Sequence, residues 1–224
     1  MINVAIDGPA GAGKSTIARK VAADLGYMYI DTGAMYRSLA YKAITGGISI
    51  SDEPMRVISM LDDTALDIKY IGGTQHMLCD GSDITDYIRT PEVSAGASAI
   101  AAIPEVRAWL LQSQRSLASD NNCLMDGRDI GTVVLPFANI KIFLTASAEA
   151  RAKRRYDELI LKGEDVTFED VLSDMIKRDN NDSTRACAPL KQADDAILVD
   201  TSDLSFDESV AKIKNIIADK VGDK

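Results

Sequence analysis

A phosphate-loop pattern near the N-terminus constrains this chain more than any other feature. The stretch Gly8-Pro-Ala-Gly-Ala-Gly-Lys-Ser-Thr16 fits the spacing G-x-x-x-x-G-K-[ST]. Its glycines allow successive backbone N–H groups to point into one concavity that binds anions. Lys14 adds a positive charge that can reach the β- and γ-phosphates, and the Ser15 hydroxyl is an oxygen ligand suited to Mg²⁺. The pattern predicts binding of a nucleoside triphosphate; the alternative is an ordinary glycine-rich turn.

The segments on either side of the loop match the expected context. Ile2–Asp7 has the pattern of a short buried strand, and Lys14–Leu25 has that of a helix that Gly26 ends. The N-terminus of such a helix directs its positive dipole end at the bound phosphates. The predicted donor-binding residues of the loop are Gly8, Pro9, Ala10, Gly11, Ala12, Gly13, Lys14, Ser15 and Thr16, with Ser15 also the predicted metal ligand.

The composition excludes several classes of protein. The 224 residues suit one large or two small domains, and a hydrophobic fraction of 46% is enough for a sizeable core. A net charge of −9 argues against nucleic acid or an anionic membrane as the main partner. We find no signal peptide and no apolar run of about 18 residues, the length that a membrane helix needs. Three cysteines far apart are typical of reduced thiols, so we expect a cytoplasmic protein.

Helical and strand patterns alternate along the chain, which favours an α/β fold with a mostly parallel sheet and helices on both faces. The predicted strands are Ile2–Asp7, Met28–Asp31, Cys123–Asp126, Ile140–Thr145 and Ala196–Asp200. The predicted helices include Ala34–Thr45, Glu92–Ala102, Pro104–Ala118 and a C-terminal helix that Ser205 and Glu208 cap. Residues 65–88 break this rhythm with two hairpin signals, Gly72-Gly73 and Asp80-Gly81, which predict a small antiparallel sheet.

Arginines at separated loci predict a second anionic substrate. The first locus, Asp31-Thr-Gly-Ala-Met-Tyr-Arg37, follows a predicted strand, where ligands of open α/β sheets bind. Thr32 can hydrogen-bond, Tyr36 can stack or donate, and Arg37 can clamp a phosphate. The alternative is a capped helix with a solvated arginine.

The second locus, Met125-Asp-Gly-Arg-Asp-Ile-Gly131, also follows a predicted strand. Asp126 ends that strand beside the phosphate loop and is placed to hold a Mg²⁺-bound water. We expect Gly127 and Gly131 to permit sharp turns that present Arg128 and Asp129 to the cleft. The alternative is a tight loop with a structural Arg–Asp pair.

The third locus lies on a predicted helix that Thr167 caps. Its stripe of Phe168, Val171, Met175, Arg178, Asp182 and Arg185 is apolar first and then charged, at helical spacing. A face that turns ionic in this way predicts a polar cavity that receives anions or a ribose. The alternative is a solvated face with weak ion pairs.

A fourth locus places Arg151, Arg154 and Arg155 on one helix face after the strand Ile140–Thr145. Like charges at this spacing repel unless an anion or Glu158 relieves them. We expect this cluster, Arg154 in particular, to grip the phosphates of the donor. The alternative is that Glu158 alone offsets the repulsion between these arginines, without a bound anion.

These residues resemble one family closely, the bacterial cytidylate kinases. The resemblance covers essentially the whole chain and rests on five segments, namely residues 7–15, 31–37, 88–93, 126–134 and 177–190. It implies a P-loop kinase fold with a five-stranded parallel sheet, a small antiparallel insert and a helical lid. The core would comprise residues 1–61, 96–150 and 191–224, the CMP-binding insert residues 62–95, and the lid residues 151–190.

The resemblance also implies roles for individual residues. Thr32, Arg107 and Asp129 would read the cytosine, with Ser98 nearby. Arg37 and Arg128 would hold the CMP phosphate, Arg178 and Asp182 would contact the ribose, and Arg185 would bridge the donor and acceptor phosphates. The residues expected to act in catalysis are Lys14, Arg37, Arg128 and Arg185.

The chain departs from the family pattern at three positions. Thr32 stands where the family often has Ser, which keeps the hydroxyl. Asn181 and Ser183 stand where some relatives carry Arg, which lowers the positive charge of the lid.

The expected reaction is transfer of a phosphoryl group from ATP, with Mg²⁺, to CMP or dCMP by a monomeric enzyme that binds neither nucleic acid nor membrane. One alternative is a kinase for another acceptor, such as UMP or AMP. Another is an ATP-dependent switch protein, although the Asn-Lys-x-Asp segment typical of guanine-binding switches is absent from the sequence.

Overall fold

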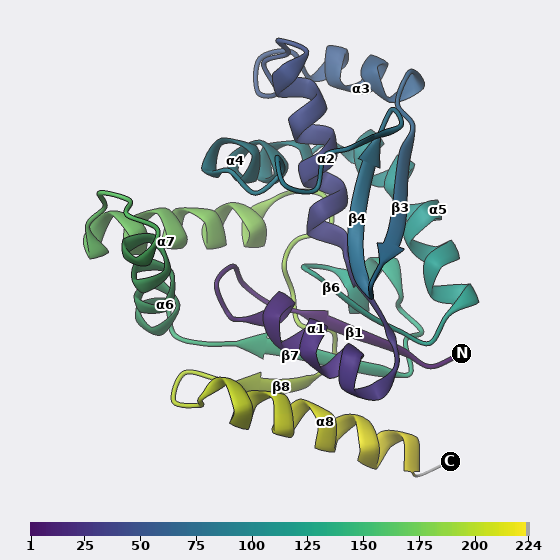
Figure 1. The fold of residues 1–224 in the computed structure, drawn as a ribbon, viewed down its shortest axis with the longest axis vertical. Helices are drawn as coiled ribbons and strands as arrows, with labels where there is room; N and C mark the ends of the chain where they lie inside the picture. Colours follow the sequence, from purple (N-terminus) through teal and green to yellow (C-terminus); the bar gives the residue numbers. More distant parts are fainter. Residues whose placement is uncertain (223–224) are drawn as a thin grey trace. The chain divides into compact units, whose positions relative to one another are not determined.

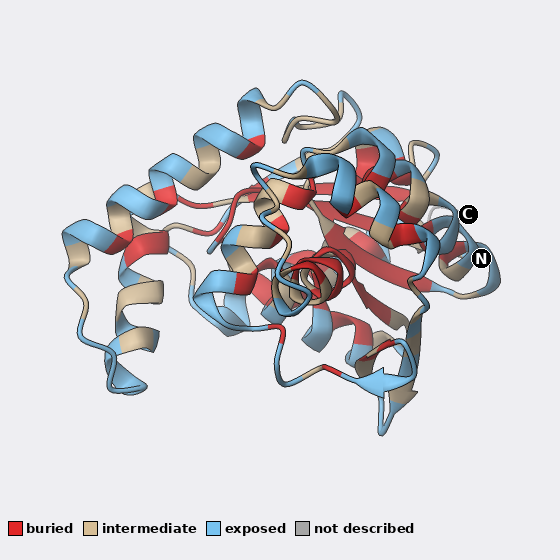
Figure 2. Ribbon diagram, turned by 90° about the horizontal axis from the view of Figure 1, so that it is seen from above, coloured by how far each residue is buried: buried red, intermediate tan, exposed pale blue. Residues whose placement is uncertain are grey.

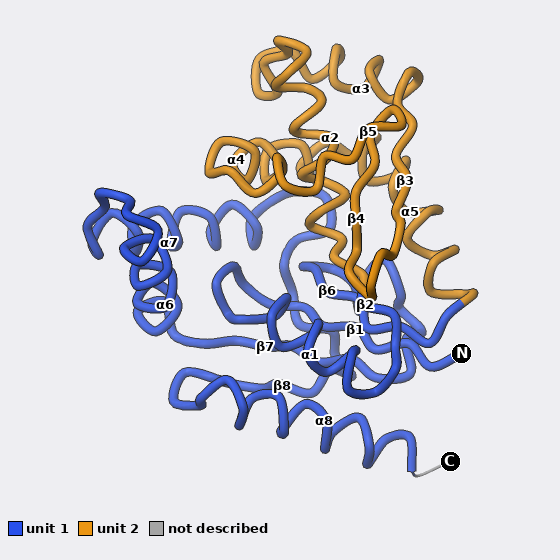
Figure 3. Tube along the Cα trace, in the orientation of Figure 1, with its two compact units in different colours: residues 1–29, 121–224 blue, residues 30–120 orange. Residues whose placement is uncertain are grey.

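The computed structural model describes residues 1–222 and divides into two compact units (Figure 3). Unit 1 comprises residues 1–29 and 121–224, and unit 2 comprises residues 30–120. Each unit has its own cluster of buried apolar side chains.

A five-stranded parallel sheet is the centre of the fold (Figure 1). Its strands are β1 (Asn3–Asp7), β2 (Met28–Asp31), β6 (Cys123–Gly127), β7 (Ile140–Thr145) and β8 (Ile197–Asp200), in the order β2-β6-β1-β7-β8. β1 pairs with β6 in the register Ile6 to Asp126 and with β7 on its other side. The carboxyl ends of β1 and β6 therefore lie side by side, so the phosphate loop after β1 is adjacent to the loop after β6.

Buried apolar residues stabilise this sheet in unit 1, and Figure 2 shows the buried residues in red along its strands. Val4 and Ile6 of β1 are fully buried, as expected for a parallel strand covered on both faces. Helices α1 (Lys14–Leu25) and α8 (Phe206–Gly222) pack against each other and contribute Ile17 and Ile213 to the same cluster.

Two further helices of unit 1, α6 (Ala148–Leu161) and α7 (Phe168–Thr184), pack against each other. Ala152, Val171 and Met175 are the buried centre of this pair, and the Tyr156 ring meets Phe168 edge-on at 6.2 Å. A π-helical turn, η1 (Ile130–Val134), follows β6.

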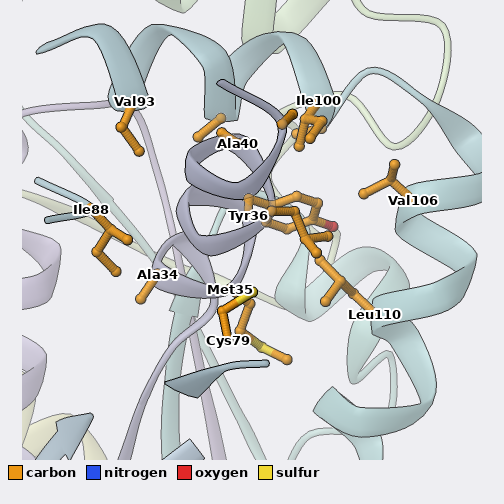
Figure 4. Close-up of a cluster of buried hydrophobic side chains, with 14 of the residues drawn as sticks. Ala34, Met35, Tyr36, Ala40, Cys79, Ile88, Val93, Ile100, Val106 and Leu110 are labelled. Carbon is orange, nitrogen blue, oxygen red and sulfur yellow. The ribbon is translucent and has the colours of Figure 1, made fainter. Parts of the chain in front are cut away.

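Unit 2 joins four helices to a small antiparallel sheet. The helices are α2 (Thr32–Thr45), α3 (Pro54–Asp62), α4 (Pro91–Ile100) and α5 (Pro104–Asp120), and the strands are β3 (Leu66–Ile71), β4 (Thr74–Cys79) and β5 (Ser82–Asp83). Figure 4 shows its core, in which Met35 and Tyr36 of α2 lie among Ile100 and Leu110 of the neighbouring helices. Gly96 of α4 faces Ala40 of α2 so closely that a Cβ there would lie 3.3 Å from the alanine methyl group.

The predicted elements are largely confirmed. All five core strands and the small antiparallel sheet form, and the predicted strands Met28–Asp31 and Ile140–Thr145 have the observed bounds. The N-terminal caps that we predicted at Thr167 and Ser205 are present. Helix α2 begins two residues earlier than predicted because the Asp31 carboxylate caps it, and α3 was missed. The two compact units are defined by packing, whereas the predicted core, insert and lid were defined by function. The predicted division into core, insert and lid therefore stays a prediction.

Candidate active site

The phosphate loop in unit 1 has the backbone that its sequence predicts. Gly13 is the N-cap of α1 in the left-handed region, and α1 begins at Lys14. At Gly8, where φ is 148°, a Cβ would overlap the carbonyl oxygen of Leu144 in β7. At Gly11, where φ is 74°, a Cβ would lie 2.9 Å from the Met175 methyl group. Glycine is required at Gly8 because the β7 backbone leaves no room for a Cβ, and it is favoured at Gly11 because other residues rarely adopt this positive φ.

The loop encloses a buried lysine among charged side chains. Lys14 is 5% exposed and its Nζ donates to the Pro9 carbonyl at 2.7 Å. Burial, together with the nearby guanidinium of Arg128, holds the pKa of Lys14 well below its usual range. Asp126 and Asp7 raise the Lys14 pKa in opposition, and Arg178 lowers it further. A polyphosphate would supply the negative charge that stabilises these cations, so the cluster fits an anionic ligand.

Two hard oxygen ligands meet beside the lysine. The Ser15 hydroxyl donates to Asp126 Oδ2 at 2.6 Å, and the Tyr29 hydroxyl lies 3.3 Å from Asp126 Oδ1. Mg²⁺ is held in such sites by one or two protein oxygens together with substrate phosphates. The described residues contain no group of three or more metal-ligating side chains, so a metal held by protein alone is not found in this part of the chain. Ser15 and Asp126 therefore fit a cation that arrives with a nucleotide.

Asp7 fixes the turn that presents Arg128 and Asp129. Its carboxylate accepts from the backbone N–H groups of Ile130 and Gly131, each at 2.7 Å. Burial raises the pKa of Asp7 to about 6 despite these two hydrogen bonds. Gly131 is the second residue of the π-helical turn Ile130–Val134, and its φ is not positive, so the turn does not need the conformational freedom of glycine at this position. A glycine fits there because Lys141 and Asp7 leave a Cβ little space.

Charged residues of α7 meet the same turn. Arg128 Nε donates to Asp182 Oδ2 at 2.8 Å, and Asp182 is buried. Arg185 Nη2 lies 3.5 Å from Asp129 Oδ1 and its Nε donates to the Ala188 carbonyl. Arg128, Arg178 and Arg185 are all at least half-buried, which argues against the alternative of a solvated face.

The predicted stripe holds along α7 as far as Asp182 but not to Arg185. The helix ends at Thr184, and Arg185 is extended, with φ −60° and ψ 140°. Arg185 joins the cluster through this change of backbone direction rather than through helical spacing. The positions Asn181 and Ser183 are exposed.

The three arginines of the fourth locus each contact different protein groups. Arg151 is buried and bonds to the Ala10 and Ala146 carbonyls and to Asp179. Arg154 donates to the Thr201 carbonyl at 2.5 Å, and Arg155 pairs with Glu158 at 2.8 Å. The repulsion between these arginines is therefore relieved by separate protein partners, and donor binding by Arg154 stays a prediction.

The first locus lies in unit 2, around the start of α2. The Asp31 carboxylate accepts from the Ala34 N–H at 2.8 Å and pairs with Arg37 at 2.8 Å. Arg89, which is exposed, approaches the same carboxylate at 3.6 Å. The arginine that we expected to hold a phosphate is thus oriented by the cap of its own helix. Neither Asp31 nor Arg89 was among the predicted site residues.

A second pair of predicted residues meets in unit 2. The Arg107 guanidinium of α5 lies 5.6 Å from the centre of the Tyr36 ring and donates to the Ala101 carbonyl. Both side chains are buried, as is Thr32 in the first turn of α2, and Ser98 of α4 is half-buried. A buried guanidinium over an aromatic face is fixed in direction, which suits recognition of a planar polar group.

Sequence reasoning did not predict how Asp7, Asp31 and Arg151 orient the site. Asp7 binds the backbone directly after Asp129, Asp31 pairs with Arg37, and Arg151 binds the Ala10 carbonyl of the phosphate loop. Asp7 and Asp31 each end a strand directly before a site segment, a position that offered a signal. Arg151 was predicted as part of the arginine cluster expected to grip the donor phosphates, but its contacts with the Ala10 carbonyl and Asp179 were not predicted. The described helices include none long and apolar enough to cross a membrane.

Comparison with known proteins identifies the family. The cytidylate kinase family model matches residues 4–219. The cytidylate kinase of Caldicellulosiruptor saccharolyticus is 48% identical over 223 residues, covering 100% of this chain and 98% of its own, and that of Caldicellulosiruptor bescii is 51% identical, covering 95% and 93%. A solved gluconokinase from Sinorhizobium meliloti, at 14% identity, has a TM-score of 0.51 and covers 99% of this chain and 94% of its own, a likeness of P-loop kinase fold alone. The chain belongs to the cytidylate kinase family.

Proposed function

We infer that this chain transfers a phosphoryl group from ATP to CMP, giving ADP and CDP. The observation that carries this inference is the family match across residues 4–219, which spans both the phosphate loop and every predicted acceptor residue. The buried Lys14, set among Arg128 and Arg178, supports the donor half of the reaction.

The reaction needs no general base, because the accepting phosphate oxygen of CMP is already ionised at neutral pH. The protein's contribution is positioning and stabilisation of charge on a loose transition state. We assign Lys14 to the donor phosphates and Arg37 and Arg128 to the CMP phosphate. Arg185 offsets the repulsion between the two polyanions as they are brought in line.

Recognition of cytosine requires the protein to supply both a hydrogen-bond acceptor and hydrogen-bond donors, since the base offers an N4 amino donor and the O2 and N3 acceptors. We assign Asp129 as the acceptor for N4, Arg107 as the donor to O2 and N3, and Thr32 as a third residue that reads the base, with Ser98 nearby. Uracil has a carbonyl in place of the amino group, so its O4 would face a carboxylate. Arg178 and Asp182 are assigned to the ribose, and dCMP is proposed as a second acceptor.

When bound, Mg²⁺ neutralises charge on the donor phosphates, and Ser15 with Asp126 would hold it. Residues 62–95 are proposed as the CMP-binding insert and residues 151–190 as the lid. A monomer in a reducing compartment such as the cytoplasm is proposed, which the free thiols Cys79, Cys123 and Cys187 support.

A coupled assay of ADP release across all ribo- and deoxyribonucleoside monophosphates tests the proposed function. We expect rapid ADP release with CMP and dCMP, and little with UMP, AMP or no acceptor. Preference for UMP or AMP would establish the alternative acceptor. Slow ADP release that is indifferent to any acceptor would instead establish the switch protein.

A further inference from the structure

Arg151 contacts three separate elements of unit 1 with its one guanidinium group. Its Nε donates to the Ala146 carbonyl after β7 at 2.9 Å, and its Nη1 donates to the Ala10 carbonyl of the phosphate loop at 2.9 Å. Its Nη2 pairs with Asp179 of α7 at 2.6 Å. All three nitrogens of the planar group are used, and only arginine has this geometry.

The contacts of Arg151 are shielded from water. Its side chain is 6% exposed and that of Asp179 is 22% exposed. The Oδ1 oxygen of Asp179 is buried without a hydrogen-bond donor in the described part of the chain. A carboxylate in this setting depends on its single ion pair, so the pair fixes α7 in direction much more strongly than a surface pair would.

The two ends of this connection carry different parts of the proposed site. Ala10 lies in the donor loop. Asp179 directly follows Arg178 and precedes Asp182 by one helical turn, the two residues assigned to the ribose of CMP. Met175 of the same helix lies against Gly11 of the loop, which adds an apolar contact to the polar one.

We propose that Arg151 is a positioning residue that couples the phosphate loop to α7, so that binding of ATP orders the part of α7 that binds CMP. This proposal rests on the proposed function. Reciprocity then requires CMP to tighten the binding of ATP by the same factor.

The test is calorimetric titration of the whole protein with a non-hydrolysable ATP analogue, in the absence and presence of saturating CMP. We expect CMP to raise the affinity for the analogue by at least about fivefold in the wild type. Asp179→Ala removes only the contact to α7 and should reduce this factor at least about threefold, with the affinity for the analogue alone little changed. Arg151→Lys keeps the charge but not the three-way geometry, and should reduce the factor as much.

Asp157→Ala is the matched control, because Asp157 pairs with Lys153 in an exposed ion pair on the adjacent helix α6. This variant should keep the wild-type coupling factor. The double variant Arg151→Lys/Asp179→Ala should lose no more coupling than either single variant. If Asp179→Ala does not fold, as judged by its thermal transition, Arg151→Lys decides alone.

A wild-type protein without coupling, or variants that keep the full factor, would overturn the proposal. So would an equal loss of coupling in Asp157→Ala. Turnover of CMP by the same wild-type sample tests the proposed function separately, so failure of one is distinguishable from failure of the other.

Discussion

The donor loop of unit 1 and the predicted acceptor residues of unit 2 are built in different ways. The donor loop is nine consecutive residues, whose backbone and left-handed glycines form the cradle. The predicted acceptor residues of unit 2 are side chains from three helices, exemplified by Arg107 of α5 over Tyr36 of α2. A site made by backbone tolerates little change of volume, whereas one made by side chains tolerates adjustment but depends on each group's orientation.

The largest expected effect is on stability, when one methyl group is added to a glycine of the donor loop and, for comparison, to a glycine of α2. Gly8→Ala would place its Cβ against the Leu144 carbonyl at a positive φ, and neither the strand nor the loop can move aside. Gly33→Ala in α2 would meet only the side-chain ends of Arg37 and Asp31, each at 3.1 Å. We expect Gly8→Ala to lower the free energy of unfolding by more than about 4 kcal/mol and Gly33→Ala by less than about 1 kcal/mol. Urea denaturation measures both, and equal costs would contradict the distinction.

The next effect concerns catalysis in the donor half. Lys14→Met keeps the apolar stem and removes the buried ammonium group, whose charged form burial disfavours. We expect kcat to fall by about 10²–10³-fold, because a stabilising charge at the transition state is lost. The free energy of unfolding should stay the same or rise. A variant that keeps near-normal turnover of CMP would remove Lys14 from the donor site.

A third prediction concerns pH and the base of the donor loop. The pKa of Asp7 is about 6 in the folded protein, against 3.8 for an unperturbed Asp carboxyl group. At a pH between these two values, the folded state therefore holds a proton that the unfolded chain has released. The free energy of unfolding should therefore fall as the pH rises from about 4 to 6, by up to about 3 kcal/mol, and this contribution is constant outside that window.

Asp7→Asn isolates this contribution because it cannot titrate. The difference in free energy of unfolding between the wild type and Asp7→Asn, followed by urea denaturation from pH 4.5 to 7.5, should change in the stated direction. Parallel profiles for the two proteins would contradict the assignment.

The smallest effect concerns base recognition. Asp129→Ala removes the carboxylate proposed to accept from the cytosine amino group. The preference for CMP over UMP is measured as the ratio of the two kcat/KM values. This ratio should fall by a factor that corresponds to about 1–3 kcal/mol of transition-state free energy. Asp52→Ala removes an exposed carboxylate that accepts from the Ser49 hydroxyl and lies outside the proposed insert and lid, so it is the control and should leave the ratio unchanged.

Those parts of the fold that depend on local pattern were predictable from the sequence. The five strands, the phosphate loop and the caps at Thr167 and Ser205 are each specified by a few neighbouring residues. Helix α3 was missed because its short apolar face, Val57 and Leu61, gives little periodic signal beside an exposed Met55. The extended backbone at Arg185 interrupts a spacing that looked helical.

The predicted site residues were found by charge, but their orientation was not. Nothing in the sequence indicates that Arg128 pairs with Asp182, which lies far along the chain. The contacts of Arg151 with Ala10 and Asp179 likewise arise from packing of α6 against two other segments. Long-range side-chain pairs of this kind require the three-dimensional structure.

The central claim is that the donor loop and the acceptor residues bind different nucleotides, and crossed binding measurements test it most directly. The affinities for CMP alone and for a non-hydrolysable ATP analogue alone are measured for Lys14→Met and Arg37→Met. The cap of α2 uses Asp31 Oδ1, whereas Arg37 contacts Oδ2, so we expect the cap to persist in the latter variant. We predict that Lys14→Met weakens the ATP analogue at least about tenfold and leaves CMP within about twofold, and that Arg37→Met does the reverse. Loss of the same nucleotide in both variants would contradict the account.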